Sequence, residues 1–300
     1  MNVNKGKAIV RLVIAAIVAV VSITVFIGIL STYNIAFKHY SGDPTYVIKD
    51  VTLSEDVQSI TLNWYIGGIE VIPSEGTEIR IVEKAYVNMD YNKSFNESNN
   101  NGELTIQSRN KAFFSIFNWT MNPSFLQVYL PVGKSLDYVH LNAISGTYDF
   151  NQLITNSFEV NLTSGKLNLD AITSYALDLT IISGDVDISN SLFDSVDITM
   201  TSGDLNYDNF TDRFVADMIS GKMTLRFPNR PSALDLQVTS GSATVNIITS
   251  DAFSVALDKT SGSFSSNLDS QDDIYHYLSG GPQYSIDMIA GSVNFRVYGE

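Results

Sequence analysis

The chain has 300 residues, of which 44% are hydrophobic and 17% are charged, and it contains no cysteine. This composition excludes a fold held by disulfides, thiol catalysis and cysteine-ligated zinc. Eighteen basic and 32 acidic residues give a formal net charge of -14, which repels phosphate backbones and argues against nucleic acid as a partner.

The first predicted element is a transmembrane helix at residues 12–30, a run of 19 residues without a charged side chain. At about 1.5 Å per residue, this run nearly crosses the roughly 30 Å hydrocarbon layer of a bilayer. A secretory signal has a shorter apolar region of about 7 to 15 residues and a cleavage site, which is missing here. We therefore expect a retained anchor in the lipid bilayer, not a cleaved signal.

The charges that flank this span predict its orientation. Lys5, Lys7 and Arg11 precede it, so the positive-inside rule places the amino terminus in the cytoplasm. We expect a cytoplasmic tail at residues 1–11, a juxtamembrane linker at 31–55 and an extracytoplasmic domain at 56–300. The predicted localisation is therefore the cell membrane, with a single pass.

A repeat of about 19 residues organises the regular part of that domain, residues 137–300. Apolar and polar residues alternate on both sides of each Ser-Gly or Ala-Gly step, which predicts short strands with one buried face and a sharp corner at the glycine. Copies too short to bury their own apolar face must stack. The sequence predicts an all-β fold, a single-stranded β-solenoid (β-helix) of about nine short coils. The steps begin at Ser145, Ser164, Ser183, Ser202, Ser220, Ser240, Ser261 and Ala290.

A further apolar residue follows about eight positions after several steps, and we expect it to point inward. The residues concerned are Leu153, Ile172, Phe210 and Ile248.

The irregular part at 56–136 begins with a degenerate copy around Gly67. We expect strands at 78–87, 103–108 and 125–130, and a polar loop without periodicity at 91–102. A second insertion, at 109–125, gathers aromatic residues, and two interpretations of it stay open. It forms either a cap over the apolar end of the coil or an interaction patch for a partner or a membrane. Its aromatic residues are Phe113, Phe114, Phe117, Trp119 and Phe125.

These features resemble a bacterial family named "putative adhesin" domain, also described as a domain of unknown function. The resemblance covers roughly residues 56–300 and depends on the serial steps ISGTYDF, TSGKLNL, ISGDVDI and TSGDLNY and on LPVG at 130–133. It implies a β-solenoid without an established activity, in membrane-anchored surface and envelope-stress proteins. The family supplies no catalytic motif, and the long aromatic insertion departs from its compact pattern.

Residues that could carry chemistry are sparse. His39, His140 and His276 are the three histidines, and none lies within metal-site spacing of another. Phosphate-loop, nucleophile-elbow and zinc-helix motifs are all missing. Eight equivalent steps without a histidine in register cannot each carry an activated serine. We expect no catalytic, cofactor-binding or metal-binding residue.

Acidic residues offer one more candidate, because stacking places Asp185 over Asp204 and Asp178 over Asp197. Like charges about 5 Å apart repel unless a cation or solvent screens them. A face with Asp185, Asp187 and Asp204 could bind calcium or cleave polysaccharides. Lysines occupy the equivalent positions of neighbouring copies, which favours a solvated face of mixed charge.

The sequence as a whole predicts a non-enzymatic, membrane-anchored cell-surface protein that presents a β-solenoid for interaction or adhesion at the cell envelope. Its expected partners are the bilayer at residues 12–30 and a cell-wall polymer or a membrane protein. One alternative is an accessory or sensor component of an envelope stress response, acting through a membrane-protein partner. The other is a polysaccharide-acting enzyme that uses the face with Asp185, Asp187 and Asp204.

Overall fold

The computed structural model describes residues 43–54, 56–88, 90–91, 94–109 and 123–299, which form strands and turns without an α-helix. The strands are β1 (Tyr46–Leu53), β2 (Ser59–Ser74), β3 (Ile79–Ala85), β4 (Asn96–Asn100), β5 (Glu103–Gln107), β6 (Ser124–Pro131), β7 (Ser135–Asn151), β8 (Ile154–Leu162), β9 (Lys166–Asp170), β10 (Thr173–Phe227), β11 (Ala233–Ile248), β12 (Phe253–Lys259), β13 (Ser263–Ser266), β14 (Asp269–Gln271), β15 (Ile274–Tyr277) and β16 (Gln283–Tyr298).

The predicted membrane span at 12–30 lies outside the described residues. Within the described part of the chain, no helix has the length and apolar character that crossing a membrane requires.

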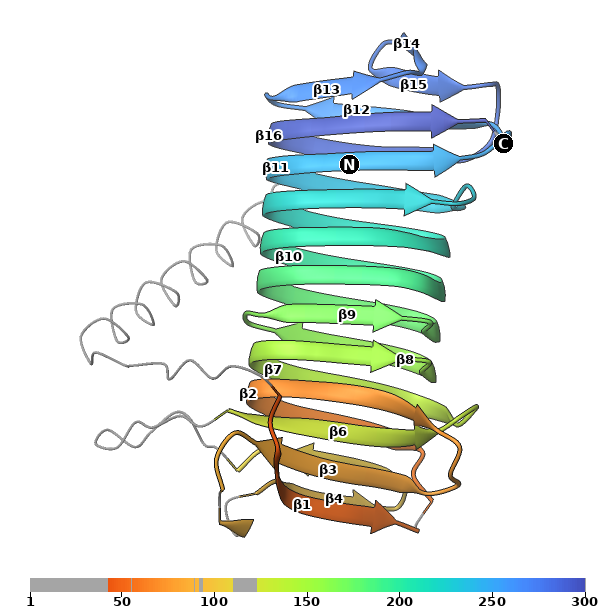
Figure 1. Ribbon diagram of the computed structural model, residues 1–300. Coiled ribbons are helices and arrows are strands. Elements are labelled where there is room, and N and C mark those ends of the chain that lie inside the picture. The colour runs from red at the N-terminus through yellow and green to blue at the C-terminus, as the bar shows by residue number, and fades with distance from the viewer. Residues whose placement is uncertain (1–42, 55, 89, 92–93, 110–122, 300) are drawn as a thin grey trace, which may run out of the picture. The chain divides into compact units, whose positions relative to one another are not determined.

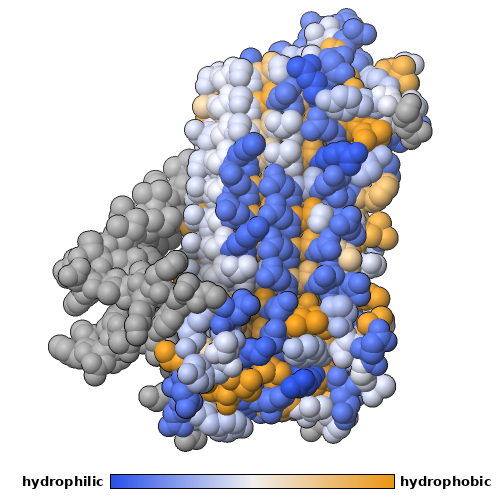
Figure 2. All heavy atoms as spheres, in the orientation of Figure 1, coloured by the Kyte–Doolittle hydropathy of each residue, from blue (hydrophilic) through white to orange (hydrophobic). Residues whose placement is uncertain are grey.

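Successive windings stack in parallel and in register, so the predicted β-solenoid is confirmed (Figure 1). Each winding has a strand before its glycine and a second strand after it. Leu177 pairs with Phe158 before the glycine, and Val186 pairs with Leu167 after it. The outward side chains consequently align in columns across the windings (Figure 2).

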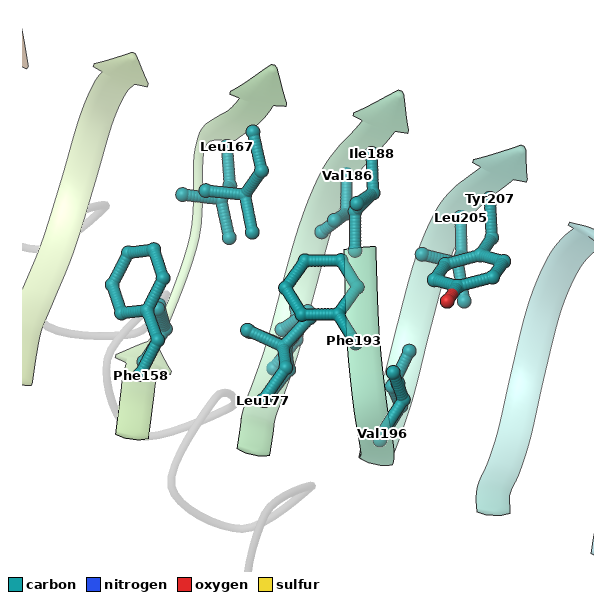
Figure 3. Packing of buried hydrophobic residues seen from close by; sticks show 14 of the residues in the cluster. Phe158, Leu167, Leu177, Val186, Ile188, Phe193, Val196, Leu205 and Tyr207 are labelled. Carbon is teal, nitrogen blue, oxygen red and sulfur yellow. The ribbon is translucent and has the colours of Figure 1, made fainter. Parts of the chain in front are cut away.

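The core lies between the two strands of each winding. Phe158, Leu177 and Val196 point inward from the strands before the glycine and meet Leu167 and Val186 from the strands after it (Figure 3). All five side chains are fully buried. Burial of each large apolar side chain stabilises the fold by roughly 1.5 to 3 kcal/mol, so identical positions repeated in every winding build one continuous core.

Glycines form a column at the corner between the two strands. A Cβ on Gly203 would lie 2.0 Å from the carbonyl oxygen of Gly184, and Gly203 has a φ of +119°. The corner therefore needs glycine for its left-handed backbone and for the close approach of the next winding. In stacking order, the column contains Gly67, Gly146, Gly165, Gly184, Gly203, Gly221, Gly241, Gly291 and Gly262.

At the N-terminal end, stacking order differs from chain order. β2 lies between β7 on one side and a winding made of β5 and β6 on the other. The chain thus leaves β2, builds the outer winding and returns to place β7 against the free edge of β2. β3 and β1 continue the sheet beyond β6 in antiparallel pairing, and β4 pairs with β5.

The C-terminal end shows the same inversion. β16 pairs with β11 on one edge and with β12 and β13 on the other. Ala290 therefore stacks on Ser240, and the step at Ser261 lies beyond it. Stacking order departs from chain order here as well, because the hairpin of β14 and β15 lets the chain double back before its last strand.

Two boundaries expected from the sequence are also wrong. β1 lies inside the predicted linker at 31–55, where it pairs with β3. β4 lies inside the predicted polar loop at 91–102 and forms a hairpin with β5. Asn101 and Gly102 connect the two strands with φ values of 54° and 90°, the left-handed geometry that an Asn-Gly hairpin turn requires.

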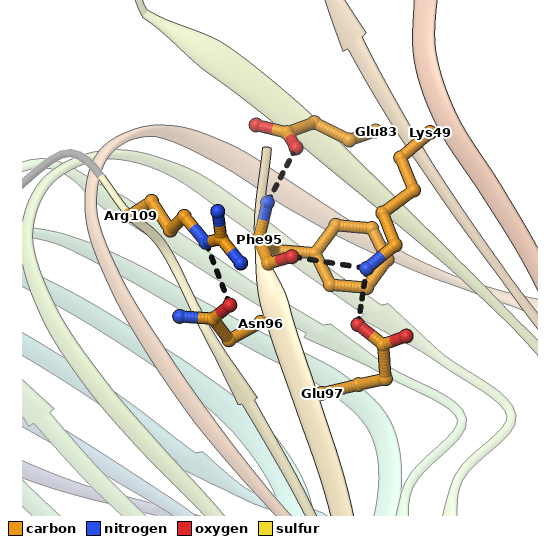
Figure 4. A network of polar contacts seen from close by, with 6 residues as sticks. All are labelled: Lys49, Glu83, Phe95, Asn96, Glu97 and Arg109. Carbon is orange, nitrogen blue, oxygen red and sulfur yellow. Dashed lines mark hydrogen bonds and ion pairs between the residues drawn. The ribbon is translucent and has the colours of Figure 1, made fainter. Parts of the chain in front are cut away.

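A buried polar network joins β1, β3 and β4 (Figure 4). Lys49 Nζ donates to the Phe95 carbonyl at 3.1 Å and pairs with Glu97. Glu83 accepts a hydrogen bond from the Phe95 amide at 2.8 Å, and burial raises the pKa of its carboxyl. These bonds satisfy polar groups beside the apolar core and fix β4 at the end of the stack.

The sequence predicts that the apolar residue about eight positions after a Ser-Gly step points inward, and the structure confirms this for some of these residues only. Leu153 and Ile172 are buried, but Phe210 is exposed. Asn209 is buried in its place, donates to the Ile188 carbonyl at 2.8 Å and accepts from the Ser191 amide at 2.6 Å. The winding from Ser202 to Ser220 is one residue shorter than its predecessors, which moves Phe210 outward.

Candidate interaction surfaces

The solenoid presents two flat faces that differ in charge. We call the outward side chains of the strands before each glycine the pre-glycine face, which includes Asp178, Asp217 and Asp235. We call those of the strands after each glycine the post-glycine face, which includes Asp185 and Asp187.

The post-glycine face holds all three aspartates singled out in the sequence, among compensating neighbours. Asp187 lies 3.3 Å from Lys166 Nζ and accepts a hydrogen bond of 2.8 Å from Asn206 Nδ2. Asp185 pairs in register with Lys166. Asp204 follows Gly203 in the next winding and is exposed. This arrangement gives a face of mixed charge, and partners on both sides hold Asp187.

Amide side chains bind carboxylates along one column of the post-glycine face, in which Glu70 and Asp149 are direct neighbours. Gln127 Nε2 donates to Glu70 at 2.8 Å, and Asn168 donates to Asp149. The contact between Asn206 and Asp187 repeats the pairing two windings further on. Each of these amides donates to a carboxylate of an adjacent winding, so the column stabilises the stack by hydrogen bonds to charged groups.

Carboxylates accumulate on the pre-glycine face. Burial raises the pKa of Asp178, and the charges of Asp197 and Glu159 raise it further. Burial also raises the pKa of Asp217, with added repulsion from Asp197, Asp235 and Asp287. The face thus carries acidic side chains in successive windings that destabilise one another's ionised form.

Asp217 and Asp235 are the centre of this acidic group. One carboxylate oxygen of each is buried without a hydrogen-bond partner. Burial and the charge of Asp287 raise the pKa of Asp235, whereas Arg213 lowers it. No three acidic or histidine side chains of the described residues are arranged to hold a metal ion. What the arrangement offers is a negative field over several windings, which attracts cationic groups of a partner.

An apolar edge follows the post-glycine strands, where the chain turns back. Ile154, Leu192 and Phe210 are 38%, 52% and 49% exposed there. Leu192 and Phe210 line a hollow of about 700 Å³ together with Arg226 and Pro228. Figure 2 shows hydrophobic side chains along the right-hand edge, where the arrowheads of Figure 1 end.

Of the predicted aromatic patch, only Phe125 belongs to the described residues; Phe113, Phe114, Phe117 and Trp119 lie outside them. Phe125 packs edge-on against Tyr86 at 5.5 Å between ring centroids and covers Gly68. It lines a hollow of about 500 Å³ with Lys84 and Asp149. Ser124, just before it, pairs with Gly67, so the aromatic insertion joins β6 at the glycine corner.

Sequence reasoning missed the acidic group around Asp217 and the apolar edge around Leu192. The stacking of Asp178 and Asp197 was a visible signal for the first. Asp287 could not be added to it from the sequence, because β16 reaches this position only through the inverted stacking order.

His140, one of the three histidines considered in the sequence, lies on the pre-glycine face, 3.5 Å from Glu159 and 3.0 Å from Asn161.

Several solved structures are similar to this chain. A "putative adhesin" from Bacteroides fragilis is 13% identical, with 82% of this chain and 97% of that chain covered and a TM-score of 0.49. A "putative adhesin" from Parabacteroides distasonis is 15% identical, with coverages of 82% and 96% and a TM-score of 0.48. A "putative lipid binding protein" from the same species is 13% identical, with coverages of 82% and 96% and a TM-score of 0.46.

No curated protein matches the chain. The family model described as Toastrack DUF4097 matches residues 57–288, which include the first part of β16 and every glycine of the column except Gly291. Since the match covers most of the chain, this β-solenoid protein belongs to the Toastrack DUF4097 family.

Proposed function

We propose that this protein is a non-enzymatic, membrane-anchored surface protein that presents its β-solenoid for contact at the cell envelope, with the pre-glycine face as the contact surface. The observation that supports this proposal is the run of carboxylates from Asp178 through Asp217 and Asp235 across successive windings. Because windings are spaced about 4.8 Å apart, these carboxylates can make a series of weak contacts with one partner.

A series of linked weak contacts gains avidity without a deep pocket. The post-glycine face is a poorer candidate, because Lys166 and Asn206 engage Asp187. A partner for the pre-glycine face carries basic groups, on a cell-wall polymer or on the surface of another membrane protein. Anchoring through residues 12–30 would hold the solenoid at the outer surface of the membrane.

The topology can be tested by cysteine labelling, because the chain has no native cysteine. Asn4→Cys tests the proposed cytoplasmic tail, and Ser263→Cys tests an exposed position of the solenoid. A membrane-impermeant maleimide added to intact cells should label the Ser263 variant, and it should label the Asn4 variant only after lysis. Labelling of both or of neither in intact cells contradicts the proposed topology.

The contact face can be tested by photo-crosslinking in the same cells. A photoreactive residue at Thr199 probes the pre-glycine face, and one at Asn206 is the matched control on the post-glycine face. We expect covalent capture of envelope polymer or protein from Thr199 and little from Asn206. Replacing Asp178, Asp217 and Asp235 with asparagine should abolish that capture. Equal capture from both faces would contradict the choice of face.

A second candidate function is an accessory or sensor role through the aromatic insertion. Its support is the pairing of Ser124 with Gly67, which brings one end of the insertion to the glycine corner. Deleting residues 110–122 should abolish capture of a membrane-protein partner in that role. The same deletion should leave capture from Thr199 unchanged if the pre-glycine face is the contact surface.

A further inference from the structure

The last strand of the chain, β16, occupies a slot between two other windings. One edge of β16 pairs with β11 from Asp235↔Ser285 to Ile248↔Tyr298. Its opposite edge pairs with β12 and β13. The 16-residue strand β16 is therefore enclosed on both edges by strands that do not directly precede it in the chain.

Side-chain contacts inside the slot fit β16 closely. Tyr284 donates its hydroxyl to the Pro231 carbonyl at 2.6 Å, and its ring stacks on Phe253 with 5.0 Å between centroids. Near the other end of β16, the Asn267 amide donates to the Val297 carbonyl at 2.8 Å and accepts from the Val297 amide at 2.9 Å. The slot thus recognises both the backbone and the side chains of this strand.

Neither wall of the slot depends on the covalent connection to β16. β11 contributes Gly241 and the outer winding contributes Gly262, which stack on the two sides of Gly291. Hydrogen bonds, the glycine column and apolar packing supply all of these contacts. A strand of the same sequence from another molecule would make the same contacts.

The connection into β16 lies at the surface and has a disfavoured backbone. Leu278 is 62% exposed with a φ of 59°, in the left-handed region that non-glycine residues rarely adopt. Gly280 and Gly281 follow with φ values of 93° and 80°. A Cβ on Gly281 would lie 1.9 Å from the Ala252 carbonyl oxygen, so the loop is folded tightly back on β12. Extension of this loop would release Leu278 from its left-handed conformation.

We propose that β16 exchanges between two copies of this chain, each copy placing its last strand in the slot of the other. Reciprocal exchange of an identical element gives a closed dimer, and tight hinge loops favour it. Exchange at this position would join two solenoids near their C-terminal ends. The dimer would present two pre-glycine faces, although the exchange itself does not depend on the function of that face.

Two single-cysteine variants of the full-length chain test the exchange directly. Ser242 and Ser292 pair across the slot, so Ser242→Cys is made in a chain with one tag and Ser292→Cys in a chain with another. The two proteins are unfolded together in detergent and denaturant, refolded and oxidised. We expect a disulfide-linked dimer that carries both tags, at least about tenfold above control, because exchanged strands hold the thiols at high effective concentration.

The matched control replaces Ser242→Cys with Thr147→Cys, a position just after a glycine of the same column but several windings from the slot. A single chain with both Ser242→Cys and Ser292→Cys shows that the substitutions are tolerated, because it should form an intramolecular disulfide. If that chain closes but the mixed dimer does not exceed the Thr147 control, the exchange is disproved. Leu278→Gly should lower the yield of mixed dimer by relieving the closed loop.

Discussion

Gly291 stacks directly on Gly241, although Gly262 lies between them in the sequence. The inversion depends on the hairpin of β14 and β15, which carries the chain past the outer winding and back. β2 takes the equivalent inner position at the other end, between β7 and the winding of β5 and β6. At both ends, therefore, the chain builds the outer winding between two strands that pair with each other: β5 and β6 lie between β2 and β7 in the sequence, and β12 and β13 lie between β11 and β16.

Disulfide pairing should report this stacking order. Thr244→Cys with Asn294→Cys places the thiols on in-register neighbours. Thr244→Cys with Ser265→Cys places them on opposite sides of β16, because Asn294 pairs with Ser265 as well. We expect oxidation to close the first pair and not the second, as measured by free-thiol titration and gel mobility. Closure of the second pair alone would establish a serial stack.

Gly203→Ala should destabilise the fold by about 3 kcal/mol or more, as backbone strain and a backbone clash together produce the largest losses. Its added Cβ would lie 2.0 Å from the Gly184 oxygen. Gly133→Ala is the matched control, because Gly133 has a φ of +76° but no atom within 4 Å of the added Cβ. Its expected cost is about 1 kcal/mol. Equal losses in denaturant unfolding would mean that stacking contributes nothing.

The pre-glycine face should make stability depend on pH. Burial and neighbouring carboxylates raise the pKa of Asp217 and Asp235 in the folded state. The folded protein therefore binds these protons more tightly than the unfolded chain, and their contribution to the free energy of unfolding falls as the pH rises through the raised pKa.

Asp217→Asn with Asp235→Asn should accordingly raise the free energy of unfolding at neutral pH. The gain should shrink as the pH falls through the raised pKa of these carboxyls, where they become protonated in the folded parent. Urea unfolding at several pH values measures this difference. The control, Asp185→Asn with Asp204→Asn, removes the same number of carboxylates from the post-glycine face, where Lys166 lies in register with Asp185. A gain that grows on acidification would contradict the assignment.

Asn209→Ala should cost about 3 kcal/mol, because it removes two buried hydrogen bonds, one from the Ser191 amide and one to the Ile188 carbonyl. The control is Asn206→Ala, which removes an exposed contact with Asp187 and should cost less than about 1 kcal/mol. Thermal unfolding of the two variants measures the difference. Similar losses would show that the buried hydrogen bonds of Asn209 contribute no more to stability than the exposed contact of Asn206.

The windings themselves could be predicted from the sequence because their signals are local. Alternation around Leu177 and Val186 identifies strands, and the regular step identifies the corner. The sequence indicates that the corner glycine has a left-handed backbone. It does not indicate that the glycine also lets the next winding approach closely, because the contact between Gly203 and Gly184 depends on the distance between two windings. The β4 hairpin did carry a local signal, the Asn101-Gly102 turn inside a polar stretch.

Stacking order could not be predicted from these local signals. Thr239-Ser240-Gly241 and Thr260-Ser261-Gly262 carry the same step, so either can lie next to any winding. This ambiguity also hid the acidic group, since Asp287 reaches Asp235 only when β16 enters the slot. Phe210 was misassigned for a related reason, because a winding that is one residue shorter changes which side chain faces inward.

The enclosed position of β16 also determines how the chain would respond to a pulling force. In a serial solenoid, tension on the last residue peels off one edge strand, and the hydrogen bonds break one after another. Tension on the C-terminal end of β16 is instead resisted by β11 on one edge and by β12 and β13 on the other. The two ladders share the load in shear, so the domain should resist extraction from its own terminus more strongly than from a loop of the outer winding.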